Sequence, residues 1–125
     1  LEMGNSMMVP FCCARALDIY KRTGNHLGEA DTYRLLANTL AMRRDWSTAE
    51  QLFVDSLRLN EEYGNPLGAA ETQRDLGRML SEQGRKSEAA TVLRSSLTGF
   101  RDLGAQVDVR NVNSMLESLN HATAS

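Results

Sequence analysis

Two stretches of the sequence decide the fold: residues 24–63, GNHLGEADTYRLLANTLAMRRDWSTAEQLFVDSLRLNEEY, and residues 64–103, GNPLGAAETQRDLGRMLSEQGRKSEAATVLRSSLTGFRDL. The second aligns with the first residue for residue, and Gly104 opens a third copy, so the chain repeats every 40 residues. Self-similarity at such a period is typical of proteins that stack one helical or strand unit on the next. The identities include Gly24, Gly64 and Gly104; Leu17, Leu57 and Leu97; Leu36, Leu76 and Leu116; and the pairs Asn25/Asn65, Gly28/Gly68, Ala30/Ala70, Leu40/Leu80, Ala49/Ala89 and Ser56/Ser96.

Each period contains two amphipathic helices. Apolar residues recur at intervals of three and four, as at Tyr33, Leu36, Ala37 and Leu40, and no segment alternates with a period of two. The sequence therefore predicts an all-α chain without strands. The expected helices span residues 8–23, 27–43, 46–63, 67–83, 86–103 and 107–121.

The joints between these helices carry turn signals. Gly24, Gly64 and Gly84 are suited to the left-handed conformation that ends a helix, and Pro66 is suited to begin the next one. Ser47 and Ser87 lie near two helix starts, where a hydroxyl caps free amides, so we expect both to act as caps.

Composition excludes several classes of protein. With 42% hydrophobic and 24% charged residues, the 125-residue chain resembles an average globular domain. A formal net charge of −2 gives no sign of a nucleic-acid binder, and no apolar run approaches the ~20 residues that span a bilayer. The chain begins at Leu1 without an initiating methionine, so we expect a piece of a longer protein.

No catalytic, metal-binding or cofactor-binding constellation is visible. His26 and His121 have no evident metal partners, and zinc sites need about four ligands at recognisable spacings. Cys12 and Cys13 are adjacent, which predicts no disulfide and a reducing compartment, most simply the cytoplasm. Cys13 aligns with the core position Phe53, so a buried thiol is favoured over a nucleophile. We therefore expect no enzyme.

The repeat resembles the tetratricopeptide (TPR) family. Tyr33, Leu36, Ala37, Leu40, Ala49, Phe53 and Ser56 look like one TPR unit, and Leu76, Gly77, Leu80, Ala89, Leu93 and Ser96 look like a second. The period of 40 exceeds the usual ~34 residues. It is similar to the elongated variants in kinesin light chains, cell-polarity scaffolds and bacterial signalling regulators.

The resemblance implies an α-solenoid of about six helices forming a single domain over residues 1–125. The expected parts are a loose N-terminus (1–7), a leading helix (8–23), repeat 1 (24–63), repeat 2 (64–103) and a partial repeat 3 (104–121). It also implies a scaffold that binds a peptide or partner protein along a concave surface lined by the first helix of each unit. The exposed positions carried over to those helices are Asp31, Arg34, Asn38, Ala41 and Met42; Glu71, Arg74, Asp75, Arg78 and Ser81; and Asn111, Ser114 and Ser118.

Among these, Arg34, Asn38, Arg74 and Arg78 are spaced to form a polar, basic strip flanked by Asp31 and Glu71. Arginine suits carboxylates, which makes an acidic peptide the expected ligand. The alternative is that Asp31, Glu71 and Asp75 pair with the arginines and leave a solvated face without a ligand.

Two further alternatives concern the chain as a whole. It is also compatible with a sensor segment that controls an attached transcription regulator or signalling protein. Apolar residues at both ends, such as Leu17, Ile19, Val112 and Leu119, are expected to leave open surface that stacks on a longer protein or on a second copy. The Met-rich start at Met3, Met7 and Met8 reads as an adaptable binding stripe or, in preference, a loosely packed terminus.

Overall fold

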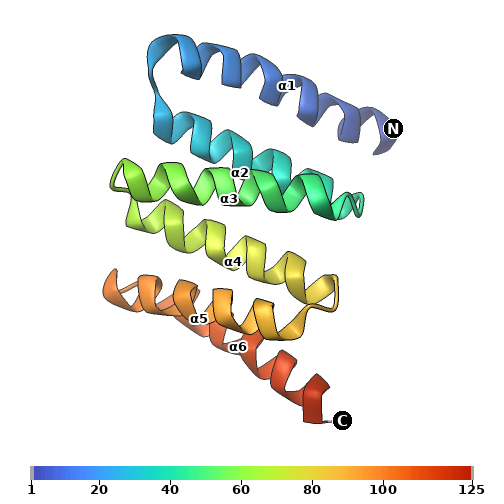
Figure 1. The fold of residues 1–125 in the computed structure, drawn as a ribbon, viewed down its shortest axis with the longest axis vertical. Coiled ribbons are helices and arrows are strands. Elements are labelled where there is room, and N and C mark those ends of the chain that lie inside the picture. Colours follow the sequence, from blue (N-terminus) through green and yellow to red (C-terminus); the bar gives the residue numbers. More distant parts are fainter. Residues whose placement is uncertain (1, 125) are drawn as a thin grey trace. The chain divides into compact units, whose positions relative to one another are not determined.

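A computed structural model describes the backbone of residues 2–124 and the side chains of residues 10–121. Within this range every regular element is an α-helix, which confirms the all-α prediction (Figure 1). The first three helices pack in succession, and so do the last three, as expected of stacked helix pairs. The helices are α1 (Glu2–Thr23), α2 (His26–Met42), α3 (Trp46–Glu62), α4 (Pro66–Glu82), α5 (Lys86–Asp102) and α6 (Gln106–Ala124).

The helix bounds agree closely with the predicted ones except at the ends of the chain. The helices α2 to α5 begin and end within one residue of the prediction, because glycine and proline mark their limits in the sequence. Helix α1 begins at Glu2 and not at residue 8, so Pro10 lies inside the helix. The side chains of Met3, Met7 and Met8 lie outside the described residues.

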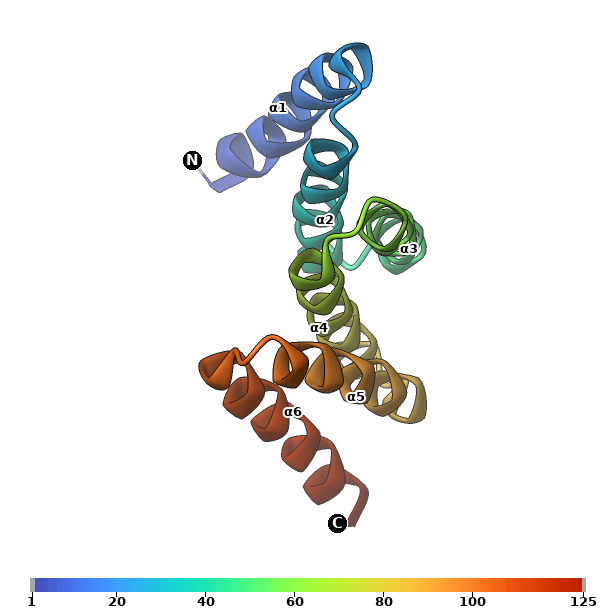
Figure 2. The ribbon, with the colours of Figure 1, turned by 90° about the vertical axis from the view of Figure 1, so that its left-hand side faces the viewer.

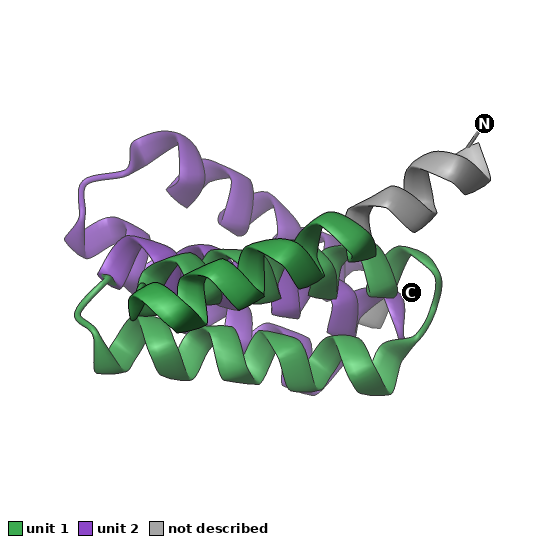
Figure 3. Cartoon of the chain, turned by 90° about the horizontal axis from the view of Figure 1, so that it is seen from above, with its two compact units in different colours: residues 1–65 green, residues 66–125 purple. Residues whose placement is uncertain are grey.

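The chain divides into two compact units, shown in different colours in Figure 3. Unit 1 comprises Leu1–Asn65, and in it α2 packs against both α1 and α3. Unit 2 comprises Pro66–Ser125, and in it α5 packs against α4 and α6, while α4 also contacts α6 (Figure 2). The boundary falls two residues after the predicted end of repeat 1 at residue 63.

A buried serine joins the two helices of each pair. The Ser56 hydroxyl of α3 donates a hydrogen bond of 2.7 Å to the carbonyl oxygen of Ala30 in α2. The equivalent Ser96 hydroxyl of α5 donates to the carbonyl of Ala70 in α4 at 2.8 Å. Both serines are fully buried, so the hydroxyl must find an acceptor inside the protein. The repeat therefore preserves one specific interhelical bond as well as apolar packing.

Small residues let the helices approach closely. A Cβ added at Gly77 of α4 would lie 2.5 Å from Cδ2 of Leu93 on α5, a side chain that is fully buried. In unit 1, a Cβ added at Gly28 of α2 would meet the ring of Tyr20 on α1 at 2.6 Å. Both distances are shorter than van der Waals contact, so these glycines set the spacing between neighbouring helices.

The turns place glycine in the left-handed conformation, as the sequence predicts, with one exception. Gly24, Gly64, Gly84 and Gly104 all have positive φ, but the position equivalent to Gly84 in the first repeat is Arg44, with φ of 63°. This left-handed arginine is strained, because its Cβ crowds the following carbonyl oxygen.

The expected serine caps are wrong. Ser47 and Ser87 lie inside helices α3 and α5, because these helices begin at Trp46 and Lys86 and have their N-caps at Asp45 and Arg85. Asp45 occupies the N-cap position of α3, and its side chain makes no capping hydrogen bond. A side-chain cap forms at Asn25, whose Oδ1 accepts from the amide of Gly28 at 2.8 Å.

Candidate protein-binding surface

A polar stripe runs along α2 in unit 1. Asp31, Arg34 and Asn38 stand three and four residues apart, which places them on one face of the helix. Asp31 is exposed, whereas Arg34 and Asn38 are half-buried. Ala41, expected to be exposed on this face, is only 8% exposed, since a small apolar side chain packs into the unit. The α2 stripe therefore consists of Asp31, Arg34 and Asn38.

The equivalent stripe on α4 in unit 2 consists of Glu71, Arg74 and Arg78. Glu71 is half-buried, and the side chain of Arg78 is 50% exposed. Arg74, by contrast, is only 18% exposed. The two arginines are thus one turn apart on the same helix but differ in their access to a partner.

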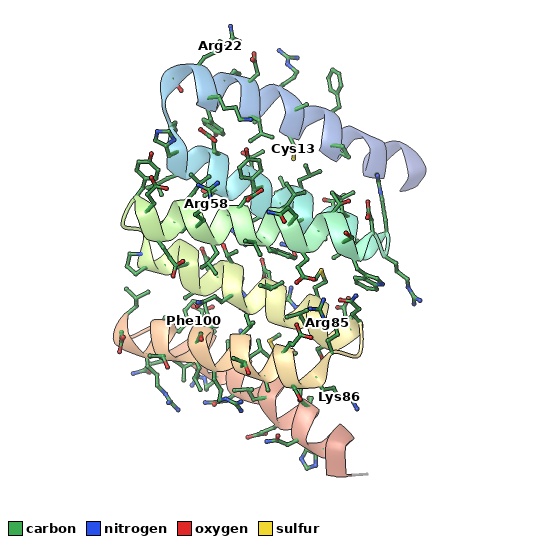
Figure 4. All side chains as sticks on the ribbon, in the orientation of Figure 1. Cys13, Arg22, Arg58, Arg85, Lys86 and Phe100 are labelled. Carbon is green, nitrogen blue, oxygen red and sulfur yellow. The ribbon has the colours of Figure 1, made fainter. Side chains whose placement is uncertain are left out.

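Arg74 is held by a network inside unit 2. Its Nε lies 3.2 Å from Oδ1 of Asp75, and its Nη1 lies 3.3 Å from Oδ1 of Asp108 on α6. The guanidinium also lies over the ring of Phe100 on α5, 5.8 Å from the ring centroid. Phe100 is fully buried and is labelled on α5 in Figure 4. Arg74 therefore ties the three helices of unit 2 together.

Asp75 was expected on the exposed face, and that expectation is wrong. Its side chain is 3% exposed, because it accepts from Arg74 and lies 3.5 Å from Nη1 of Arg78. A carboxylate is stable at such a position only when cations or donors surround it. On α4 the alternative of internal pairing therefore applies. Asp75 pairs with the half-buried Arg74 and also with Arg78, whose side chain remains half exposed.

Asp108 is the residue of this network that the sequence analysis missed. It stands where the two preceding repeats have Gly28 and Gly68, so the departure from the repeat was the available signal. As an acid in the first turn of α6 it also suits the positive end of the helix.

On α6, three predicted positions are exposed and two apolar ones are not. Asn111, Ser114 and Ser118 face solvent as expected. Val112 and Leu119 are buried, at 0% and 7% exposed, because α6 packs against α5 and α4. The expectation that these two side chains leave an open apolar surface is therefore wrong, whereas Ile19 on α1 is 49% exposed.

The described side chains include no grouping of three or more His, Cys, Asp or Glu residues that would hold a metal ion. Cys13 is buried on the side of α1 that faces α2, as the alignment with Phe53 predicted (Figure 4). Burial, and secondarily the neighbouring thiol of Cys12, raises the pKa of Cys13. Such a thiol is a poor nucleophile at neutral pH.

A membrane-spanning helix is likewise missing from the described part of the chain, where none is both long and apolar enough to cross a bilayer.

Paired antiparallel helices, a recurring interhelical serine bond and polar stripes on the first helix of each pair define an α-helical repeat protein. Two family models, both described as tetratricopeptide repeat, match residues 12–62 and residues 69–103, together more than half of the chain. The chain belongs to the tetratricopeptide repeat family, whose members are generally non-catalytic modules for protein–protein interaction. Comparison with curated proteins gives no match.

Proposed function

We propose that this chain is a non-enzymatic interaction module that binds a peptide segment of a partner protein along the first helices of its repeats. Membership of the tetratricopeptide repeat family supports binding of a protein. The partner-facing residues proposed are Asp31, Arg34 and Asn38 on α2, and Glu71 and Arg78 on α4, with Arg74 supporting the α4 surface from within unit 2.

The observation that carries this assignment is the repetition of the polar stripe. Polar side chains occupy positions 31, 34 and 38 and again 71, 74 and 78, while the same helices bury Ala30, Ala37, Ala70 and Leu76. A helix that is apolar on its packed face and carries accessible arginine and amide groups on the other presents donors for a peptide. This repetition of polar groups on the first helix of each pair supports the proposal that these faces meet a partner.

Arg74 and Arg78 differ in how accessible they are to a ligand. Arg74 is committed to Asp75 and Asp108, so its role is to hold the surface in place. Arg78 retains half of its side-chain surface for a ligand. We propose that acidic segments of a partner contact Arg78 on α4 in unit 2 and, separately, Arg34 on α2 in unit 1. A cytoplasmic location accompanies the proposal, because both cysteines are free thiols.

Affinity capture from cell extract, read by mass spectrometry, tests the assignment. The variant Arg34→Ala/Arg78→Ala is compared with wild type and with Arg58→Ala/Arg94→Ala. The control removes one exposed arginine from the second helix of each pair, and Arg58 makes only surface ion pairs with Asp55 and Glu62.

We expect partners to be lost from the first variant and retained by the control, with equal helix content by circular dichroism. Recovery of the same partners in equal amounts by both variants would show that the stripe is not the binding surface.

A further inference from the structure

A hollow of about 410 Å³ lies at the joint between α5 and α6 in unit 2. None of its lining residues belongs to the α4 stripe. It is lined by Arg101 and Gly104, which end α5 and form the turn, and by Gln106, Val109 and Arg110 at the start of α6. Two of its five lining residues are cations. The proposed function does not use this feature.

Both cations differ from the residues 40 positions earlier. Arg101 in repeat 2 stands where repeat 1 has Glu61, and Arg110 in the partial repeat 3 stands where repeat 2 has Ala70. Ala70 is buried, and its carbonyl accepts the interhelical bond from Ser96, whereas Arg110 is exposed. The position of Ala70, which packs helices together in repeat 2, is therefore a charged surface position, Arg110, in the partial repeat 3.

The rest of that face of α6 has changed in the same way. Glu117 replaces the close-packed Gly77, and Asn120 replaces the buried Leu80. A helix that packed on α6 as α5 packs on α4 would bury Arg110 and Glu117, and burying charged groups costs several kcal/mol each. This face of α6 therefore suits solvent or a polar partner, and Arg110 on it also lines the hollow.

No carboxylate is among the residues that line the hollow. Among the described residues, neither Arg101 nor Arg110 makes an ion pair. The nearby Asp108 is engaged by Arg74 at 3.3 Å, and Asp102 does not line the hollow.

Apolar surface adjoins these charges. Leu103 is 43% exposed and Val107 is 61% exposed, and both belong to the same joint. Two unpaired guanidinium groups beside exposed apolar side chains complement a carboxylate-bearing peptide.

We infer that the α5–α6 hollow is a second docking site, which takes the side-chain carboxylates of an acidic peptide segment between Arg101 and Arg110. This inference rests on the proposed function only in that the partner is a protein. The site belongs wholly to unit 2 and involves neither Arg34 nor Arg78.

Fluorescence anisotropy with a labelled, C-terminally amidated hexaglutamate peptide tests the site without any knowledge of the natural partner. The variant Arg101→Glu/Arg110→Ala installs the residues that stand 40 positions earlier, Glu61 of repeat 1 and Ala70 of repeat 2. The control Lys86→Ala/Arg94→Glu removes the same amount of positive charge from exposed positions of α5 that do not line the hollow. Arg101→Gln/Arg110→Gln serves as a milder pair should the first variant fold poorly.

We expect the hollow variants to weaken binding of hexaglutamate at least ~tenfold, since charge-assisted hydrogen bonds to two arginines are lost. The control should change affinity by no more than about twofold, because exposed charges outside the site are screened. Equal losses in both variants, or no loss in the hollow variants, would overturn the inference. So would binding of hexaglutamate with a free C-terminal carboxylate but not of the amidated peptide, because the site would then recognise a chain end. None of these outcomes depends on capture through Arg34 and Arg78, so this inference and the proposed function fail separately.

Discussion

Arg74 and Arg78 lie one turn apart on α4, carry the same charge, and are expected to respond oppositely to substitution. We consider Arg74→Met and Arg78→Met, because methionine keeps an unbranched apolar chain and similar helix propensity. Arg74→Met should destabilise the protein and leave the exposed binding donors in place. Arg78→Met should weaken partner binding with little effect on stability.

The magnitude follows from the contacts of each side chain. Arg74 makes two charge-assisted hydrogen bonds at 3.2 and 3.3 Å, and with partial exposure each contributes about 1 kcal/mol. Its position over the ring of Phe100 adds about 0.5 kcal/mol. The total of about 2–3 kcal/mol stays below the 3–5 kcal/mol typical of a broken buried pair, since Asp75 keeps Arg78 at 3.5 Å. For Arg78, half exposed, the loss is about 0.5 kcal/mol.

Urea denaturation followed by circular dichroism at 222 nm measures both values. Because the substitutions lie on one helix face and remove the same charge, Arg78→Met is the matched control for Arg74→Met. Equal losses of unfolding free energy would refute the structural role of Arg74. A loss below about 0.5 kcal/mol for Arg74→Met would show that Asp75 and Asp108 do not depend on it.

Three further predictions concern the repeat and the thiols. Ser96→Ala should lower the unfolding free energy by about 1 kcal/mol, because the bond to the Ala70 carbonyl is lost, and an unchanged urea midpoint would contradict this. Arg44→Gly should raise it by about 0.5–1 kcal/mol, since glycine relieves the left-handed backbone; a destabilised variant would show that the arginine side chain matters more. Burial raises the pKa of Cys13, so at pH 8 less of it is the reactive thiolate. Iodoacetamide should therefore modify Cys13→Ser, which retains the exposed Cys12, faster than Cys12→Ser, and equal rates would argue against a buried Cys13.

The helical framework was predictable because its determinants are local. The spacing of apolar residues and the glycines at Gly24, Gly64 and Gly84 give the helices α2 to α5 to within one residue. Repetition also identifies Ser56 and Ser96 as small equivalent positions, but it does not reveal that each donates to a carbonyl on the facing helix. The caps at Ser47 and Ser87 failed because the N-cap positions are Asp45 and Arg85, two residues before each serine.

The candidate surface was predictable only in its positions. Helical spacing places Arg74 and Arg78 on one face, and the sequence predicts both as equivalent hydrogen-bond donors. Their difference arises from Asp108, which is 34 residues away in the sequence and meets Arg74 only when α6 packs against α4 and α5. The spacing of apolar residues in either helix does not predict such a contact. Comparison of the repeats does indicate it, because Asp108 stands where the earlier repeats have Gly28 and Gly68. The same kind of departure singles out Arg101 and Arg110. In a repeat protein, the positions that keep the pattern report on packing. Those that break it with a charge are therefore the first places to look for pairing or for a partner.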